Sequence, residues 1–253
     1  MLRTIAIIPA RYASSRFPGK PLIARTGKPL IQHVVERARD ARCISRVIVA
    51  TDDRRVFEAI LGFGGEAVMT REDHPNGTSR IAEVAAALSP RQAEIVVNVQ
   101  GDEPEIEPGV IDQLVEGLIA DPDAPMATLA SEFSPGEDPS TPHIVKVVTG
   151  QVNGRLRALY FSRSLIPYDR DGSGVKPLKH PGLYAYRRDF LLHYPSLAPT
   201  ALERTEKLEQ LRALEHGYPI AIVKTRVQFH GIDTPEQYED FLARYGIRQP
   251  AGR

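Results

Sequence analysis

The 253-residue chain has one cysteine, Cys43, and no tryptophan. A single cysteine cannot form an intrachain disulfide, so a small oxidised scaffold is excluded. The seven histidines are scattered and do not form a zinc-ligand cluster. Cys43 ends a helical pattern beside Ile44, and we interpret it as a packing residue.

The chain has no excess of either charge, because 32 Lys and Arg balance 32 Asp and Glu. This argues against a broad electrostatic partner, so we expect no nucleic-acid and no membrane partner. No stretch approaches the about 18 apolar residues of a membrane span. The apolar run at residues 5–8 is too short for a signal peptide. We therefore expect a cytoplasmic protein.

Short apolar runs alternate with amphipathic segments over the first 120 residues. Strands are predicted at residues 4–9, 46–51, 66–70 and 95–100. Helices are predicted after Pro29 at the first helical position, over 53–63, over 78–88 with Thr78 as cap, and over 108–120. This order predicts an α/β fold with a mostly parallel, doubly wound sheet. Ligands in such sheets bind beyond the carboxyl ends of the strands, here after Ile8, Thr51, Thr70 and Gln100.

The second half of the chain has a different pattern. Strands are predicted at 126–131, 144–148, 156–162 and 220–224; residues 180–186 alternate, and helices are predicted at 201–216 and 235–246. We interpret this half as a mixed, β-rich extension of the same sheet, in one domain over residues 1–247. A subregion at about 125–230 faces the ligand edge, and residues 248–253 are expected to be a disordered tail.

The loop after the first predicted strand, residues 9–21, carries three cations and two serines. The cations are Arg11, Arg16 and Lys20, and the serines are Ser14 and Ser15. The loop is not a Walker sequence, because Pro21 follows the lysine. Arginine pairs bidentately with phosphate and lysine acts as a point charge, so the loop suits a polyphosphate. The alternative is a solvated basic loop.

Two aspartates are candidates for a magnesium site. Asp102 follows a buried predicted strand, beside Gly101, which allows close backbone approach. Asp233 precedes Thr234, a predicted N-cap. Magnesium is usually bound by one or two carboxylates together with substrate phosphates. In the alternatives, Asp102 or Glu103 caps the next helix, and Asp233 is only a turn residue.

The helix predicted over 201–216 has two distinct faces. Leu208 and Leu211 point to the core. Three polar side chains share another face: Glu206, Glu209 and Gln210. This stripe faces either a polyhydroxylated ligand or solvent. The loop 73–80 either reads a base edge or only caps a helix, and we interpret Tyr160 and Phe161 as core residues.

The chain resembles the 3-deoxy-manno-octulosonate (Kdo) cytidylyltransferases, or CMP-Kdo synthetases. The resemblance rests on IIPARYASSRFPGKPL (7–22), VIVATDD (47–53), FGGEAVMT (63–70), NVQGDEP (98–104), VKVV (145–148), ALYFSRSLIP (158–167), KHPGLYAYR (179–187), LERTEKLEQLR (202–212) and GIDTPEQYE (231–239). These segments run in the family's order across nearly the whole chain.

The resemblance implies a magnesium-dependent nucleotidyltransferase with a nucleotide-diphospho-sugar transferase-like fold. The anomeric hydroxyl of Kdo attacks the α-phosphorus of CTP, giving CMP-Kdo and pyrophosphate. It also implies a cytoplasmic homodimer that serves lipopolysaccharide or a related polysaccharide. The subregion at about 125–230 would bind the sugar and form the dimer.

The family pattern also implies roles for individual residues. Catalysis would use Arg11, Arg16, Lys20, Asp102 and Asp233. CTP would be bound by Arg11, Ser14, Ser15, Arg16, Lys20, Thr78, Arg80 and Asp102, with the 73–80 loop facing cytosine. The sugar would be bound by Gln100, Arg163, His180, Tyr184, Glu209 and Gln210. Magnesium would be held by Asp102 and Asp233.

Three positions depart from the family pattern. Ser79 stands where an acidic residue is common, residues 141–144 replace an Asn-Pro-Asn segment, and Pro181 stiffens the strand beside His180. An 8-amino Kdo or a sialic-type acid therefore stays open as the sugar. A glycosyltransferase is disfavoured because it does not need the polyphosphate loop, and a silent binding protein is disfavoured because every implied catalytic residue type is present.

Overall fold

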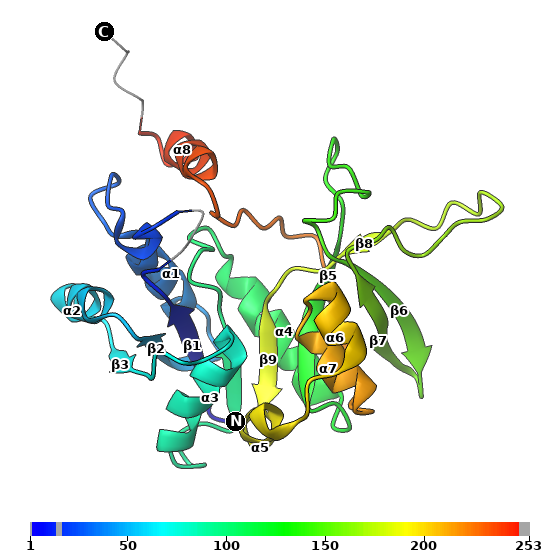
Figure 1. Ribbon diagram of the computed structural model, residues 1–253, viewed down its shortest axis with the longest axis horizontal. Coiled ribbons are helices and arrows are strands. Elements are labelled where there is room, and N and C mark those ends of the chain that lie inside the picture. Colours follow the sequence, from blue (N-terminus) through cyan, green and yellow to red (C-terminus); the bar gives the residue numbers. More distant parts are fainter. Residues whose placement is uncertain (1, 14–16, 248–253) are drawn as a thin grey trace, which may run out of the picture.

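The computed structural model describes residues 2–13 and 17–247. Their strands form a ten-stranded sheet with the order β10-β7-β6-β8-β5-β9-β4-β1-β2-β3 (Figure 1). Helices pack against this sheet, so the predicted α/β class is confirmed. The sheet is mixed rather than mostly parallel, because antiparallel pairs in the second half outnumber the parallel ones. The predicted tail at 248–253 lies outside the described residues. None of the described helices is both long and apolar enough to cross a bilayer.

The first half of the chain alternates strands and helices. The strands are β1 (Thr4–Ala10), β2 (Ile44–Thr51), β3 (Ala67–Met69) and β4 (Ile95–Asn98). The helices are α1 (Leu30–Arg39), α2 (Arg54–Gly62), α3 (Gly77–Ala87) and α4 (Pro108–Ala120), and the 3-10 turn η1 spans Lys20–Leu22. β1 pairs in parallel with β2 and β4, and β2 with β3.

Both faces of this half of the sheet are covered. Along β1, Ala6 and Ile8 join a core with α1, α2 and α4, whereas Ile5 and Ile7 join a second core with α3. A strand that is buried on both faces needs a continuous apolar run, because successive side chains point in opposite directions. The burial of β1 on both faces therefore explains the continuous apolar run near the start of the sequence.

The second half adds antiparallel pairs to the same sheet. The strands are β5 (Met126–Glu132), β6 (Lys146–Val152), β7 (Arg155–Ser162), β8 (Leu178–Lys179), β9 (Tyr184–Arg187) and β10 (Ile220–Thr225). β9 is antiparallel to both β4 and β5 and joins the two halves. β5, β10, β7, β6 and β8 pair around a closed ring. Closing the ring satisfies strand edges that would otherwise be open.

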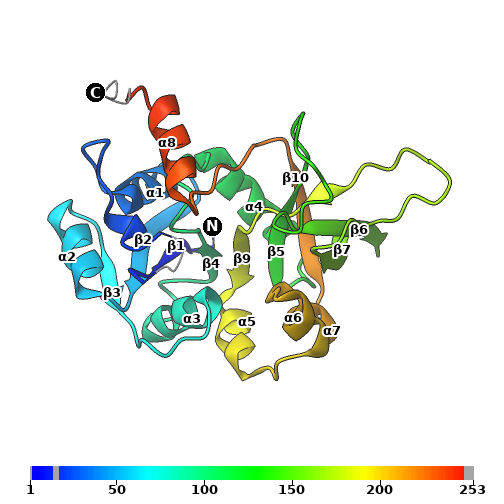
Figure 2. The same ribbon diagram turned by 45° about the horizontal axis from the view of Figure 1, so that its top comes forward.

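Helices of the second half complete the cores. They are α5 (Arg188–His193), the 3-10 turn η2 (Tyr194–Ser196), α6 (Ala201–Glu206), α7 (Gln210–Glu215) and α8 (Pro235–Arg244). After β10 the chain crosses back to the first half, where α8 lies beside α1 (Figure 2). Leu30 of α1 and Ile232, Tyr238, Phe241 and Leu242 form a small core there.

Several predicted boundaries were wrong. Pro29 is the N-cap of α1 rather than its first residue, and Asn76, whose side chain accepts from the Ser79 N–H, caps α3 in place of Thr78. The sequence did not predict α5, and β6 begins at Lys146 rather than at residue 144. Pro181 lies between β8 and β9 and not in a strand, as expected for a residue with no N–H to donate.

The predicted helix over 201–216 is two helices. Lys207 adopts the left-handed conformation, with φ 55°, and ends α6; α7 begins at Gln210. The segment has no glycine or proline, so its helical pattern continues through the break. Contacts outside the helix compensate for the strained residue: Glu206 accepts from the Ser162 hydroxyl and the Arg163 N–H. The predicted stripe of Glu206, Glu209 and Gln210 on one helix face is therefore wrong.

Candidate active site

Three cavities adjoin at the carboxyl ends of β1 and β4. The first, of about 230 Å³, is lined by Arg11, Lys20 and Asp102 among others, and shares Gly77 and Gln100 with a second of about 200 Å³. The second shares Tyr184, Leu208 and Gln210 with a third of about 410 Å³. Shared lining residues make the three cavities one continuous cleft, at the edge that the strand order predicts.

The loop after β1 closes on itself before entering η1. The Gly19 N–H donates to the Tyr12 carbonyl at 3.1 Å, and Gly19 has φ +72°. A Cβ there would lie 3.1 Å from the Tyr12 hydroxyl. The positive φ and this close contact both favour glycine at the position. Arg11 donates to the His74 carbonyl and lines the first cavity. Three predicted phosphate-binding residues lie outside the described residues: Ser14, Ser15 and Arg16.

The two predicted metal-binding aspartates meet at one ammonium group. Lys20 Nζ lies 2.9 Å from Asp102 Oδ2 and 3.4 Å from Asp233 Oδ1, and it donates to the Ile232 carbonyl at 2.6 Å. The Ile232 N–H also donates to the Asp102 carbonyl at 2.9 Å. The return of the chain to α8 therefore places Asp233 beside Asp102, although the sequence separates them widely.

Asp102 does not have the capping role that was its alternative interpretation, whereas Asp233 stands in irregular backbone, as its alternative of a turn residue also expects. Glu107, and not Asp102 or Glu103, is the N-cap of α4. Thr234 caps α8, with a capping box that includes Gln237, and Pro235 stands in the first turn as predicted. Asp233 lies just before this cap, with its side chain 42% exposed. Asp102 therefore caps no helix, and both carboxylates are partly exposed, at 31% and 42% of their side chains.

Gly101 allows the loop carrying Asp102 to pass close to β1. A Cβ at this position would lie 3.0 Å from the Pro9 carbonyl oxygen and 3.4 Å from Ile31 Cδ1. A backbone oxygen cannot move aside as a flexible side chain can. The predicted close approach is confirmed, and it places Asp102 next to the loop that carries Arg11.

The donor set fits a small hard cation that shares its coordination with a ligand. The described residues contain no cluster of three or more His, Cys, Asp or Glu side chains able to hold a metal alone. They do bring two carboxylates to the same cationic point, which in this structure is Lys20 Nζ. Such a pair is what Mg²⁺ needs when phosphate oxygens complete its shell.

Glu103 is a buried carboxyl beside this pair. Burial, followed by the charges of Asp102 and Asp233, raises the pKa of Glu103 to about 8. A Cβ on Gly231 would lie 3.0 Å from Glu103 Oε1, so the two segments approach closely here and a larger residue would require the Glu103 side chain to shift. At neutral pH Glu103 is mostly protonated and does not add a third negative charge to the site. Sequence reasoning considered it only as a helix cap.

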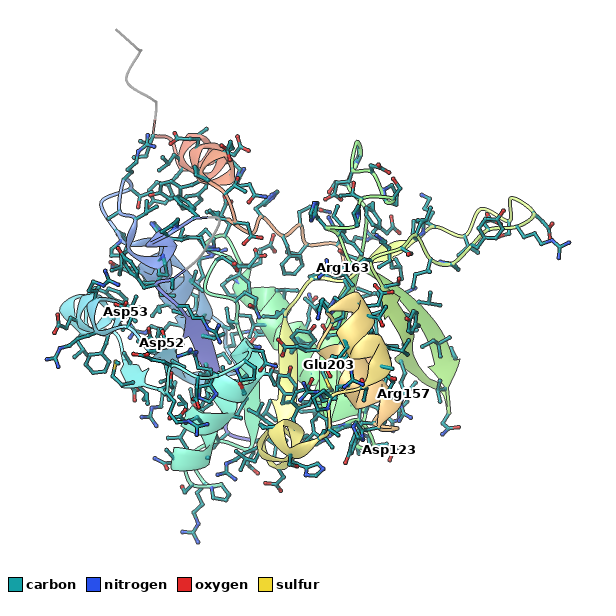
Figure 3. All side chains as sticks on the ribbon, in the orientation of Figure 1. Asp52, Asp53, Asp123, Arg157, Arg163 and Glu203 are labelled. Atoms are coloured by element: carbon teal, nitrogen blue, oxygen red, sulfur yellow. The ribbon has the colours of Figure 1, made fainter. Side chains whose placement is uncertain are left out.

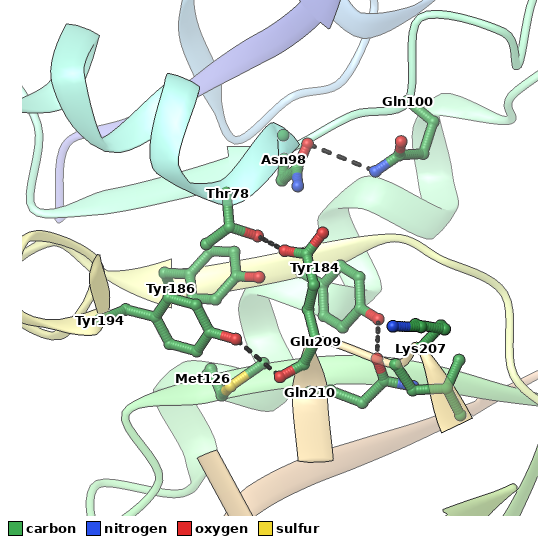
Figure 4. A pocket seen from close by; sticks show the side chains of 12 residues that line it. Thr78, Asn98, Gln100, Met126, Tyr184, Tyr186, Tyr194, Lys207, Glu209 and Gln210 are labelled. Atoms are coloured by element: carbon green, nitrogen blue, oxygen red, sulfur yellow. Dashed lines mark hydrogen bonds between the residues drawn. The ribbon is translucent and has the colours of Figure 1, made fainter. Parts of the chain in front are cut away.

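Polar side chains of α3, β9 and α7 are paired across the middle cavity (Figure 4). The Thr78 hydroxyl donates to Glu209 Oε2 at 2.6 Å, and the Tyr194 hydroxyl donates to the Glu209 carbonyl at 2.6 Å. The Tyr184 hydroxyl donates to Gln210 Oε1 at 3.1 Å. Burial raises the pKa of Glu209 above its ordinary value. These bonds hold the first residues of α7 against the cleft.

The third cavity combines a buried histidine with a buried ion pair. Burial lowers the pKa of His180 to about 3, so its ring is neutral at physiological pH. Lys179 Nζ lies 2.7 Å from Glu137 Oε2 and donates to Gln228 Oε1 at 2.9 Å. This pair joins the 133–145 loop to the segment that leads to Asp233.

The predicted sugar-binding residues do not all meet. Gln100, Tyr184, Glu209 and Gln210 line the middle cavity, and His180 lines the third. Arg163 is not among the lining residues; its guanidinium donates to the Glu206 and Pro142 carbonyls (Figure 3). Of the CTP-binding predictions, Thr78 lines the cleft. Arg80 does not line it, because its buried guanidinium contacts Thr70 and Asp52.

The structure adds lining residues that sequence reasoning missed. They are Asn98, Tyr186, Tyr194, Lys207, Lys179 and Glu137. Lys207 carried one usable signal, since it stands two residues before Glu209, an implied sugar-binding residue. Cys43 is half-buried, and burial together with Asp112 raises the pKa of its thiol to about 12. A thiol that stays protonated agrees with the packing role predicted for it.

Comparison with known proteins places these features in a family. A family model described as cytidylyltransferase matches residues 5–225. The chain is 53% identical to a 3-deoxy-manno-octulosonate cytidylyltransferase of Syntrophobacter fumaroxidans, over 94% of this chain and 95% of that one. It is 50% identical to the same enzyme of Geobacter sulfurreducens, over 94% and 98%.

Solved structures agree with the sequence comparison. A CMP:2-keto-3-deoxy-manno-octonic acid synthetase solved in complex with CTP superposes with a TM-score of 0.89 at 46% identity, covering 96% of this chain and 98% of that one. A 4-diphosphocytidyl-2C-methyl-D-erythritol synthase of Anaerococcus prevotii superposes with a TM-score of 0.61 at 14% identity, covering 97% and 99%. The second likeness is one of fold alone.

Proposed function

The chain belongs to the 3-deoxy-manno-octulosonate cytidylyltransferases, and from this premise we propose how its cleft makes CMP-Kdo and pyrophosphate from CTP and Kdo. The first cavity binds the triphosphate, and the second and third bind the acid sugar. The anomeric oxygen of Kdo forms a bond to the α-phosphorus while the bond to pyrophosphate breaks. The meeting point of the two substrates is the shared lining at Gly77 and Gln100.

The phosphate end depends on cations. Arg11 and Lys20 line the cavity and provide a fork and a point charge for phosphate oxygens. By the family pattern, the triphosphate is also bound by Arg16, Ser14 and Ser15. Fixed positive charge beside the α-phosphorus stabilises the charge that develops during attack, which is a common source of large rate enhancements.

Asp102 and Asp233 are the residues that would hold magnesium. When bound, the metal would supply charge neutralisation at the phosphates and would help orient them. Lys20 then has phosphate oxygens as partners in place of the two carboxylates it contacts in this structure. In the metal-free protein, burial and the charges of Asp102 and Asp233 raise the pKa of Glu103 to about 8, so Glu103 adds little negative charge to the pair before the metal binds.

The sugar end depends mainly on polar groups that donate or accept hydrogen bonds. Glu209, Gln210, Tyr184 and Gln100 contribute acceptors and donors for a polyhydroxylated ligand, and His180 contributes a neutral ring. Arg163 and Arg80 act through the loops they hold rather than by lining the cleft. The observation that carries the proposal is the meeting of Asp102, Asp233 and Lys20, where the first cavity, lined by Asp102, approaches the third, lined by Asp233.

Pyrophosphate release with CTP, Mg²⁺ and an acid sugar tests the function. Kdo, 8-amino Kdo and N-acetylneuraminate are compared in parallel, with Kdo expected to react fastest. Turnover with another acid but not with Kdo would keep the chemistry and change the sugar. Silence with all three, from a folded protein that binds CTP, would contradict the proposed function.

A homodimer completes the proposal. Apolar side chains lie exposed in the 125–230 subregion, among them Leu159, Leu165, Tyr168 and Val175. A second copy of this chain could cover them. Light scattering should give twice the chain mass, and a monomer at micromolar concentration would contradict this part of the proposal.

A further inference from the structure

Thr128 lies at the centre of β5, behind the sugar end of the cleft. Its side chain is completely buried, and its residue pairs with Tyr184 of β9. The hydroxyl oxygen lies 2.7 Å from the Leu183 carbonyl oxygen and 2.9 Å from His180 Nε2. No sequence motif identified this threonine, which looks like one more residue of a buried strand.

Proton counting assigns the roles in this chain of contacts. A hydroxyl has one proton, and a backbone carbonyl oxygen can only accept. The hydroxyl also lies 3.5 Å from the Pro181 carbonyl oxygen, which is too long to compete, so the 2.7 Å contact between two oxygens assigns the Thr128 proton to the Leu183 carbonyl. Its oxygen then accepts from His180, so Nε2 carries the ring proton.

The other ring nitrogen of His180 is consequently a bare acceptor. The ring is neutral because burial lowers its pKa to about 3. The ring packs edge-on against Phe161, with 4.8 Å between ring centroids. The backbone N–H of His180 donates to the Val145 carbonyl at 2.8 Å. Within residues 2–13 and 17–247, Nδ1 has no hydrogen-bond partner, and His180 lines the third cavity.

Gln210 presents the complementary group in the same cavity. Its Oε1 accepts from the Tyr184 hydroxyl, which orients the amide. Its Nε2 is buried and has no partner among the described residues. A buried donor that lacks a partner is costly, so the bound state should satisfy it. Sugar hydroxyls can donate to His180 Nδ1 and accept from Gln210 Nε2, since each hydroxyl both donates and accepts.

We propose that Thr128 is a positioning residue that selects the Nε2–H form of His180, so that Nδ1 accepts from one sugar hydroxyl while Gln210 Nε2 donates to a sugar oxygen. This proposal rests on the proposed function only for the identity of the sugar. The hydrogen-bond chain itself can be tested in the free enzyme.

The first test is the tautomer of His180, measured by NMR on full-length protein with ¹³C- and ¹⁵N-labelled histidine. The His180→Gln variant assigns the signal. The wild type should show protonated Nε2, as should Thr128→Ser, which keeps the hydroxyl. Thr128→Val removes the acceptor and should give a mixture or the opposite tautomer. A wild-type ring protonated on Nδ1 would overturn the proposal without any activity measurement.

The second test separates the substrates kinetically. Thr128→Val should raise the KM for Kdo about 10-fold, the scale of one neutral hydrogen bond, while kcat and the KM for CTP stay within about twofold. Thr128→Ser should restore the KM for Kdo. An unchanged KM for Kdo in a folded Thr128→Val enzyme would overturn the proposal. A wild type that is inactive with Kdo would instead refute the proposed function, and the tautomer would still be measurable.

Discussion

The two ends of the cleft differ in the burial and the pairing of their polar side chains. At the phosphate end, charged side chains stand on loops directly after parallel strands, and Asp102 and Asp233 remain 31% and 42% exposed. At the sugar end, buried neutral groups such as Thr128, His180 and Tyr184 are hydrogen-bonded in advance, and Lys179 is paired with Glu137. Charge that must meet a charged ligand stays hydrated until the ligand arrives, whereas neutral donors and acceptors can be fixed at low cost.

Substitutions at the two ends should therefore have different effects on the enzyme. Losing a charge at the phosphate end should reduce turnover with little effect on stability. Losing a buried partner at the sugar end should affect affinity, tautomer or pH stability. The following changes test this difference.

The largest effect is expected for Asp102→Asn. It keeps the shape but removes half of the carboxylate pair, so turnover should fall about 10³-fold at saturating Mg²⁺. The thermal midpoint should barely change, because the side chain is partly exposed and caps no helix. Pyrophosphate release and calorimetry measure the two quantities. An Asp102→Asn protein that unfolds would show that Asp102 is structural.

Lys20→Met should reduce turnover about 10²-fold, on the scale of one positioned donor. The matched control is Lys28→Met, because Lys28 also pairs with a carboxylate, Glu36, but lies away from the cleft with 41% of its side chain exposed. The control should keep wild-type turnover. Equal losses in both variants would mean that Lys20 acts only through general charge.

At the sugar end, His180 should make stability depend on pH. The unfolded chain binds a proton near pH 6.5, whereas folded His180 binds one only near pH 3. Stability is therefore lost as pH falls below about 6.5. Between pH 7 and 5 the free energy of unfolding should fall by about 2 kcal/mol more in the wild type than in His180→Gln. Urea unfolding measures both proteins at each pH. If the free energy of unfolding fell equally in the wild type and in His180→Gln, the burial of a neutral ring would be contradicted.

The smallest effect is expected for Ser79→Asp, which restores the acidic residue common in the family. Ser79 contacts Asn76 and His74 and lines a further cavity, which shares Tyr194 with the middle cavity of the cleft. The KM for CTP should change less than about threefold, because a carboxylate in the first turn of a helix is tolerated. Ser79→Ala is the control. Complete loss of CTP binding would show that the base pocket is rebuilt around Ser79.

Sequence reasoning found the phosphate end more completely than the sugar end. Arg11, Lys20, Asp102 and Asp233 carry charge next to predicted strand ends or caps, and this pattern is visible without coordinates. Thr128, Asn98 and Tyr194 are neutral residues inside ordinary apolar segments, and nothing in their spacing distinguishes them. Arg163 and Arg80 show the opposite error, because cations in recognised motifs are here used to hold loops.

The sequence by itself determined the alternation of strands and helices, the loops that would carry charge, and the family. These depend on local periodicity and on residue types at element ends, which are short-range properties. Only the tertiary structure decided that α8 returns to put Asp233 on Lys20, that Lys207 breaks the helix before Glu209, and that His180 Nε2 contacts the Thr128 hydroxyl. Those outcomes depend on contacts between distant segments, whose partners no local pattern names.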